Sequence, residues 1–69
     1  METMETLEYR GVIDPSGGSL VICSAWDDDG NLVRFAGDWR MVEAIPAGAE
    51  VEVPSWAILS RRPAFEVIT

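Results

Sequence analysis

Acidic residues with a definite spacing are the first candidates for chemistry in this chain. Asp27, Asp29 and Asn31 have the one-three-five spacing used by calcium-binding loops, and Asp38 falls at the twelfth position. Such a loop requires glycine at its sixth position and a bidentate glutamate at its twelfth. This chain has Leu32 and Asp38 there, and the flanking stretches are typical of strands rather than helices. We therefore predict an exposed, hydrated hairpin loop and no metal site.

A second candidate is the carboxylate pair Glu50 and Glu52, which alternates with apolar residues over 49–53. Two residues apart on a strand, these side chains share one face at a separation of about 7 Å, which is within the range of acid–base catalysis. Catalytic carboxylates, however, are tuned by burial in a cleft. The alternation instead directs both towards water. We interpret them as a solvated strand face, which Glu43 extends into an acidic stripe.

Nucleophilic chemistry is the third possibility. Cys23 is the single cysteine, it lies in an apolar run, and the chain contains no histidine. A Cys–His nucleophile, an internal disulfide and a structural Cys/His metal site are therefore excluded. We expect a buried, unreactive thiol. Because no nucleophile is paired with a base, we predict that the protein is not an enzyme and needs no cofactor.

Charge gives the strongest signal about partners. The chain of 69 residues has 12 Asp and Glu against 5 Arg, without lysine, for a net charge of −7. Binding to nucleic acid or to an anionic membrane is disfavoured, because such affinity comes mostly from Lys and Arg. The natural target is a basic surface on another protein. The lack of a disulfide pair, of a signal peptide and of a long apolar run favours a cytoplasmic location.

Short strands separated by turn signals are expected to position these residues. Apolar runs on both sides of the Asp-Gly-containing loop 27–31 predict a β-hairpin. Residues 39–45 fit either a strand or a helix, and residues 55–60 fit either a strand or one helical turn capped by Ser55. The candidate strands cover 7–13, 19–26, 32–36, 49–53 and 64–69.

These elements predict a mainly β fold. We expect a small single-domain antiparallel barrel or sandwich of five to six short strands, with room for one short helix. An α+β fold is the alternative. Residues 1–6 are expected to be frayed, and residues 7–69 are expected to form the single domain.

The three tryptophans are candidates for either core or interface. In so small a domain we expect at least two of them to lie in the core, because large rings bury the most area per residue. Trp39 is the best candidate for an interface, since Asp38 and Arg40 flank it directly after Gly37.

The whole-chain profile resembles that of small phage-encoded inhibitors of bacterial defence, such as anti-CRISPR proteins and DNA mimics. Small size, acidity, the lack of catalytic groups and disulfides, and the tryptophan content carry this resemblance. No motif contributes to it, so it assigns no functional residue. The resemblance implies a CRISPR effector complex as partner, blocked DNA access as mechanism, and a bacterial host cell as location.

We therefore predict a non-enzymatic acidic protein that docks on a basic, nucleic-acid-binding protein surface and inhibits it. The alternative is a small SH3-like or OB-like accessory module of a larger protein assembly. The prediction requires the acidic residues to share one side of the fold. The residues expected to contact the partner are Asp27, Asp28, Asp29, Asp38, Trp39, Glu43, Glu50 and Glu52.

Overall fold

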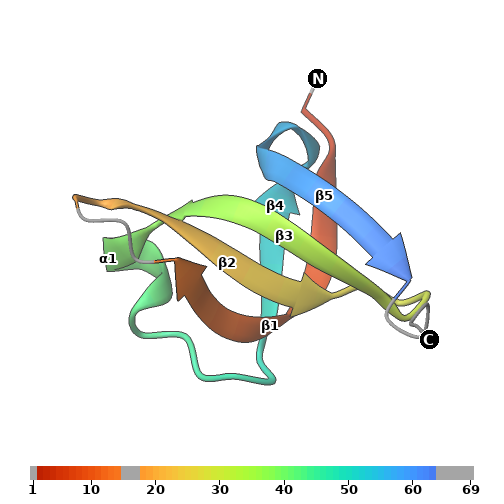
Figure 1. The fold of residues 1–69 in the computed structure, drawn as a ribbon, viewed down its shortest axis with the longest axis horizontal. Coiled ribbons are helices and arrows are strands. Elements are labelled where there is room, and N and C mark those ends of the chain that lie inside the picture. Colours follow the sequence, from red (N-terminus) through yellow and green to blue (C-terminus); the bar gives the residue numbers. More distant parts are fainter. Residues whose placement is uncertain (1, 15–17, 64–69) are drawn as a thin grey trace.

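Strands dominate the structure, a computed structural model that describes residues 2–14 and 18–63 (Figure 1). The predicted mainly β fold is confirmed. One short α-helix and one turn of 3-10 helix complete the described chain. The elements in chain order are β1 (Met4–Asp14), β2 (Leu20–Trp26), β3 (Asn31–Asp38), α1 (Trp39–Val42), β4 (Glu50–Pro54), η1 (Ser55–Ala57) and β5 (Ile58–Pro63).

The five strands form one antiparallel sheet with the order β4-β1-β2-β3-β5. In a flat sheet the first and last of five strands would lie about 19 Å apart. The two outer strands here are consecutive in the chain and are joined by the three residues of η1. The four Cα–Cα steps from Pro54 to Ile58 span at most about 14 Å. The sheet therefore has to curl into the half-barrel seen in Figure 1.

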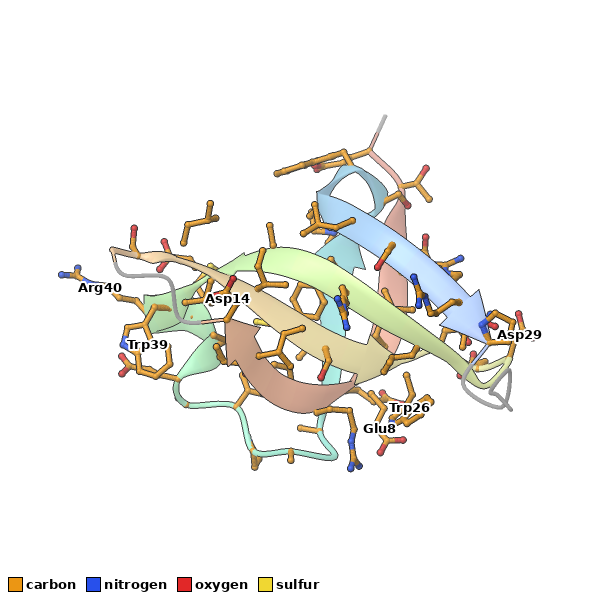
Figure 2. All side chains as sticks on the ribbon, viewed as in Figure 1. Glu8, Asp14, Trp26, Asp29, Trp39 and Arg40 are labelled. Atoms are coloured by element: carbon orange, nitrogen blue, oxygen red, sulfur yellow. The ribbon has the colours of Figure 1, made fainter. Side chains whose placement is uncertain are left out.

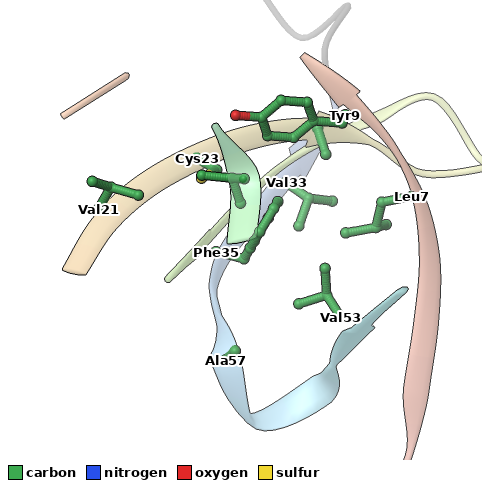
Figure 3. Close-up of a cluster of buried hydrophobic side chains, with 10 residues drawn as sticks. Leu7, Tyr9, Val21, Cys23, Val33, Phe35, Val53 and Ala57 are labelled. Atoms are coloured by element: carbon green, nitrogen blue, oxygen red, sulfur yellow. The ribbon is translucent and has the colours of Figure 1, made fainter. Parts of the chain in front are cut away.

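The concave face of the half-barrel holds the core (Figure 3). Alternate residues of each inner strand point to it, as the two-residue period of a strand requires. In the first strand, Leu7 and Tyr9 point inward and are buried. The other buried residues are Val21, Cys23, Ala25, Val33, Phe35, Val42, Val53 and Ala57.

The predicted hairpin is confirmed. Strands β2 and β3 pair without a register shift from Leu20 opposite Asp38 to Trp26 opposite Leu32. The connecting loop turns at Gly30, whose φ of 82° lies in the left-handed region that glycine adopts at little cost. Strand β2 lies in the middle of the sheet, but only one of its faces is fully buried.

The two segments with open alternatives are resolved. Residues 39–42 are helical, and Asp38 caps this helix by accepting a hydrogen bond from the Arg40 backbone N–H at 2.9 Å. Residues 55–57 form the 3-10 turn and a strand follows directly. The predicted cap at Ser55 is wrong, because Pro54 holds the capping position and the Ser55 hydroxyl bonds to Glu5 instead.

The first strand begins earlier, and the strand after η1 ends later, than predicted. Met4, Glu5 and Thr6, which we expected to be frayed, lie in β1 and pair with β4. Strand β5 continues through Pro63, opposite Asn31. The strand predicted over 64–69 lies outside the described residues. No helix in the described part of the chain has the length and apolar character needed to cross a bilayer.

Candidate functional site

The predicted contact residues fall into three separate groups. Asp27, Asp28 and Asp29 are at the β2–β3 hairpin, whereas Asp38, Trp39 and Glu43 surround α1. Figure 2 shows Asp29 and Trp39 at opposite ends of the molecule, which extends 36 Å along its longest axis. Glu50 and Glu52 lie on β4. The eight residues therefore do not form one surface.

Asp27 belongs to the fold of the hairpin rather than to its exposed tip. One of its carboxylate oxygens accepts hydrogen bonds from the backbone N–H groups of Asp29 at 2.9 Å and Asn31 at 2.8 Å. The other accepts one from the Asn31 side-chain amide at 2.8 Å. The Asp27 side chain is only 11% exposed, and Arg61 Nε lies 3.5 Å from it. The prediction of an exposed loop is thus wrong for Asp27, and of the three aspartates only Asp28 and Asp29 are exposed.

These contacts set the ionisation of Asp27. Burial of the carboxyl raises its pKa, but the hydrogen bonds from Asn31 and Asp29 and the charge of Arg61 together outweigh that effect. The pKa of Asp27 therefore lies below its ordinary value. Within the described ranges, no three His, Cys, Asp or Glu side chains gather in a way that could hold a metal ion.

The outer face of β1 and β4 carries a group of carboxylates that comes from two distant segments. Glu8 lies directly opposite Glu50, and Glu52 lies opposite Thr6 on the same face. All three glutamates are exposed. We call Glu8, Glu50 and Glu52 the acidic sheet face. Among the described residues, one ion pair touches it, between Glu8 and Arg10 at 3.8 Å.

The acidic sheet face occupies only one half of the outer surface. Across the sheet, Glu8 pairs with Trp26, Trp26 with Leu32, and Leu32 with Arg62. Arg34 lies on the same β3–β5 half, opposite Ser60. The outer surface therefore changes from acidic at β4 to basic at β5, with a half-buried tryptophan between them. Figure 2 shows Glu8 and Trp26 side by side.

Sequence reasoning did not include Glu8 among the candidate residues. The alternation of Leu7, Glu8 and Tyr9 already placed the glutamate on the outward face. What the sequence lacked was any signal that 50–54 pairs with 4–8, because these segments are more than forty residues apart. The acidic sheet face depends on that pairing.

An apolar groove of about 270 Å³ lies between α1 and the corner formed by β4 and η1. Its apolar lining comes from four elements and the segment after α1. Met41 and Trp56, each 74% exposed, also line it. Among the described residues that line the groove, the charged ones are Asp38 and Glu52. Its buried or half-buried apolar residues include Phe35, Val42, Ile45, Val51, Val53 and Ala57.

The expectation that at least two tryptophans lie in the core is wrong. Trp39 is 43% exposed, Trp56 is 74% exposed, and Trp26 is only half-buried. Trp26 shares the outer face with the other half-buried residues of β2, since Val21, Cys23 and Ala25 take the inner one. The indole N–H of Trp56 donates to the Glu2 carboxylate.

A group of polar contacts links the first and last strands on the concave side. Glu5 of β1 accepts hydrogen bonds from Arg61 of β5 and from the Ser55 hydroxyl, the latter at 3.3 Å. Arg61 also approaches Asp27. We call these contacts the Arg61 bridge. Arg61 thus balances the charge of two nearby carboxylates.

Cys23 is fully buried, as predicted. Burial raises the pKa of its thiol, and a hydrogen bond with Tyr9 lowers it by less. The thiol is thus held in its protonated, unreactive form at neutral pH.

Comparisons of this chain with protein-family models, with curated proteins and with solved structures found no match. The resemblance to phage-encoded inhibitors stays a prediction.

Proposed function

We propose that the protein is a non-enzymatic binding protein that docks its acidic sheet face on a basic, nucleic-acid-binding protein surface and inhibits it. The register that sets Glu8 opposite Glu50, with Glu52 beside them, carries the proposal. Like charges directly opposite each other destabilise a sheet. A cationic partner would offset that repulsion, so the arrangement favours the bound state.

The net charge of −7 acts at longer range. It attracts the protein to a positively charged surface and speeds their encounter. A partner that binds DNA through Lys and Arg offers such a surface along its phosphate track. The bound protein would occupy this track and exclude DNA. The implied partner class is a CRISPR effector complex, and the implied location is the bacterial cytoplasm.

Trp26 supports a protein partner. It lies beside Glu8 on the outer face and is half-buried, so one part of the ring is open to contact. Protein interfaces are enriched in aromatic residues, which supply apolar area next to charged contacts. An acidic patch beside a tryptophan can therefore combine electrostatic attraction with apolar burial.

The test is affinity capture from a bacterial lysate on the immobilised protein at about 0.1 M salt, with duplex DNA as the competitor. We expect a captured basic protein that duplex DNA displaces and that about 1 M salt releases. Replacing Glu8, Glu50 and Glu52 by Gln should weaken its binding at least about tenfold. The matched control removes the same charge elsewhere, with Asp28→Asn, Asp29→Asn and Glu43→Gln, and should weaken binding about threefold or less.

Three results would contradict the proposal. If DNA does not displace the captured protein, the inhibitory mechanism is wrong. If the control variant weakens binding as much as the sheet-face variant, total charge rather than the acidic sheet face determines the contact. A partner that remains bound at about 1 M salt in fixed stoichiometry would indicate the accessory module of a larger assembly instead.

A further inference from the structure

The apolar groove points to a second contact with the same partner. We infer that it receives an apolar side chain from a partner segment in which that side chain is flanked by Lys or Arg. This inference rests on the proposed function and specifies the chemistry of the docked segment. It adds an anchor to the electrostatic contact of the acidic sheet face.

The exposure of the lining residues shows where a bound side chain would bury the most apolar surface. Val42, Val53 and Ala57 are buried and form part of the core, whereas Met41 and Trp56 are each 74% exposed. Methionine and tryptophan are enriched in protein interfaces, since a flexible thioether and a broad ring adapt to an apolar partner. A side chain seated between these two would remove apolar surface from water on both.

The size of the groove favours a side chain over a larger ligand. Its volume of about 270 Å³ exceeds the roughly 150 Å³ of a cavity that holds benzene. It lies below the range of about 300–1,000 Å³ typical of small-molecule sites. A Leu, Met or Phe side chain from a partner is thus the occupant that suits it.

Charge selects the residues that flank this side chain. Asp38 and Glu52 line the groove, and no arginine of the described chain does so. Glu52 belongs also to the acidic sheet face, so this residue of the edge strand β4 is common to the groove and to that face. Lys or Arg next to the apolar side chain would meet these carboxylates, whereas Asp or Glu there would be repelled. The occupant is therefore apolar at its centre and basic at its sides.

Three short peptides with blocked ends test this inference. The first carries one central Leu between Lys and Arg residues, the second has Ser in place of Leu, and the third keeps Leu but has neutral Ser and Asn flanks. Each is titrated into the ¹⁵N-labelled protein at about 0.1 M salt. We expect the first peptide to bind about tenfold more tightly than the second. Only the first should shift the resonances of Met41, Val42 and the Trp56 indole strongly.

Substitutions in the groove test whether the tighter binding of the Leu peptide depends on its lining residues. Met41→Ala and Trp56→Ala should each remove most of the advantage of the Leu peptide over the Ser peptide. Both side chains are largely exposed, so these variants should fold, which circular dichroism checks. The control is Leu20→Ala, which removes an apolar side chain of 62% exposure outside the groove. It should keep the advantage.

The outcomes separate this inference from the proposed function. Equal binding of the Leu and Ser peptides, with shifts only at Glu8, Glu50 and Glu52, overturns the groove as a docking site and leaves the acidic sheet face in place. Equal binding of the neutral and basic Leu peptides overturns the requirement for Lys or Arg. Failure of both basic peptides to bind overturns the proposed function together with this inference.

Discussion

Both side-chain oxygens of Asp27 accept hydrogen bonds from within their own loop. The spacing of Asp27, Asp29 and Asn31, which is shared with calcium loops, here serves a different purpose. An Asp at the start of a tight turn satisfies the N–H groups that the turn leaves unpaired. The carboxylate that would ligate a metal in a calcium loop thus accepts hydrogen bonds from the hairpin loop instead.

The contacts of Asp27 predict a loss of stability when they are removed. Asp27→Ala should lower the free energy of unfolding by about 1–2 kcal/mol, because three donors lose their acceptor. Asp28→Ala, at an exposed neighbour in the same turn, should change it by less than about 0.5 kcal/mol. Urea denaturation at neutral pH measures both. Equal effects of the two substitutions would contradict the structural role of Asp27.

The lowered pKa of Asp27 gives this contribution a definite pH dependence. A carboxyl whose pKa is lower in the folded protein stabilises it fully above its unfolded value, which is near 3.8. The contribution is lost as the pH falls through the folded pKa. The stability difference between the wild type and Asp27→Asn should therefore be constant near neutrality and shrink below about pH 3.8. A difference that grows on acidification would show the opposite shift.

For single residues, the face to which a side chain points was easier to predict than the residue that lies opposite it on the neighbouring strand. Alternation correctly directed both Glu50 and Glu52 outwards. The alternation in β2 also indicates that Trp26 faces outwards. We nevertheless expected most tryptophans in the core, because so small a domain has few large apolar residues to bury. The residue opposite a given side chain depends on strand register, which no local pattern contains.

Among the elements, β5 was the hardest to foresee. Its residues Ile58–Pro63 do not alternate between apolar and polar. The sequence Arg61-Arg62-Pro63 is more typical of the end of a strand than of its interior. The strand is held by its pairing with β3 and is supported on the concave side by the contacts of Arg61 with Glu5 and Asp27. The matching feature in β1 is Glu5, which also faces the concave side. The contact joins two segments more than fifty residues apart, so local sequence patterns could not reveal it.

The Arg61 bridge predicts a difference between two adjacent arginines. Arg61→Ala should lower the free energy of unfolding by roughly 0.5–1 kcal/mol and speed amide hydrogen exchange in β5, because partly exposed ion pairs stabilise only modestly. Arg62→Ala, which points to the other face opposite Leu32, should leave both nearly unchanged. Equal exchange rates in the two variants would show that the bridge does not hold β5.

At the scale of the whole molecule, local and long-range features differ in how far they could be predicted. The hairpin of β2 and β3 was predictable, since its turn and both apolar runs are adjacent in sequence. The placement of β4 beside β1 and β5 beside β3 depends on contacts between distant segments. This arrangement brings Glu8 and Glu50 together, and it also places the hairpin and α1 at opposite ends. It therefore determines which part of the charge of −7 forms a surface.

The repulsion across the acidic sheet face can be measured with a double-mutant cycle. Glu8→Gln and Glu50→Gln should each raise the free energy of unfolding by about 0.5 kcal/mol, and Glu8→Gln by the smaller amount because its pair with Arg10 is also lost. Together they should raise it by less than the sum, since either change alone removes the repulsion. About 1 M salt should reduce these gains. Strictly additive effects would mean that the two carboxylates do not interact. A stabilised double variant that also binds its partner more weakly would show that this surface exchanges folding stability for binding.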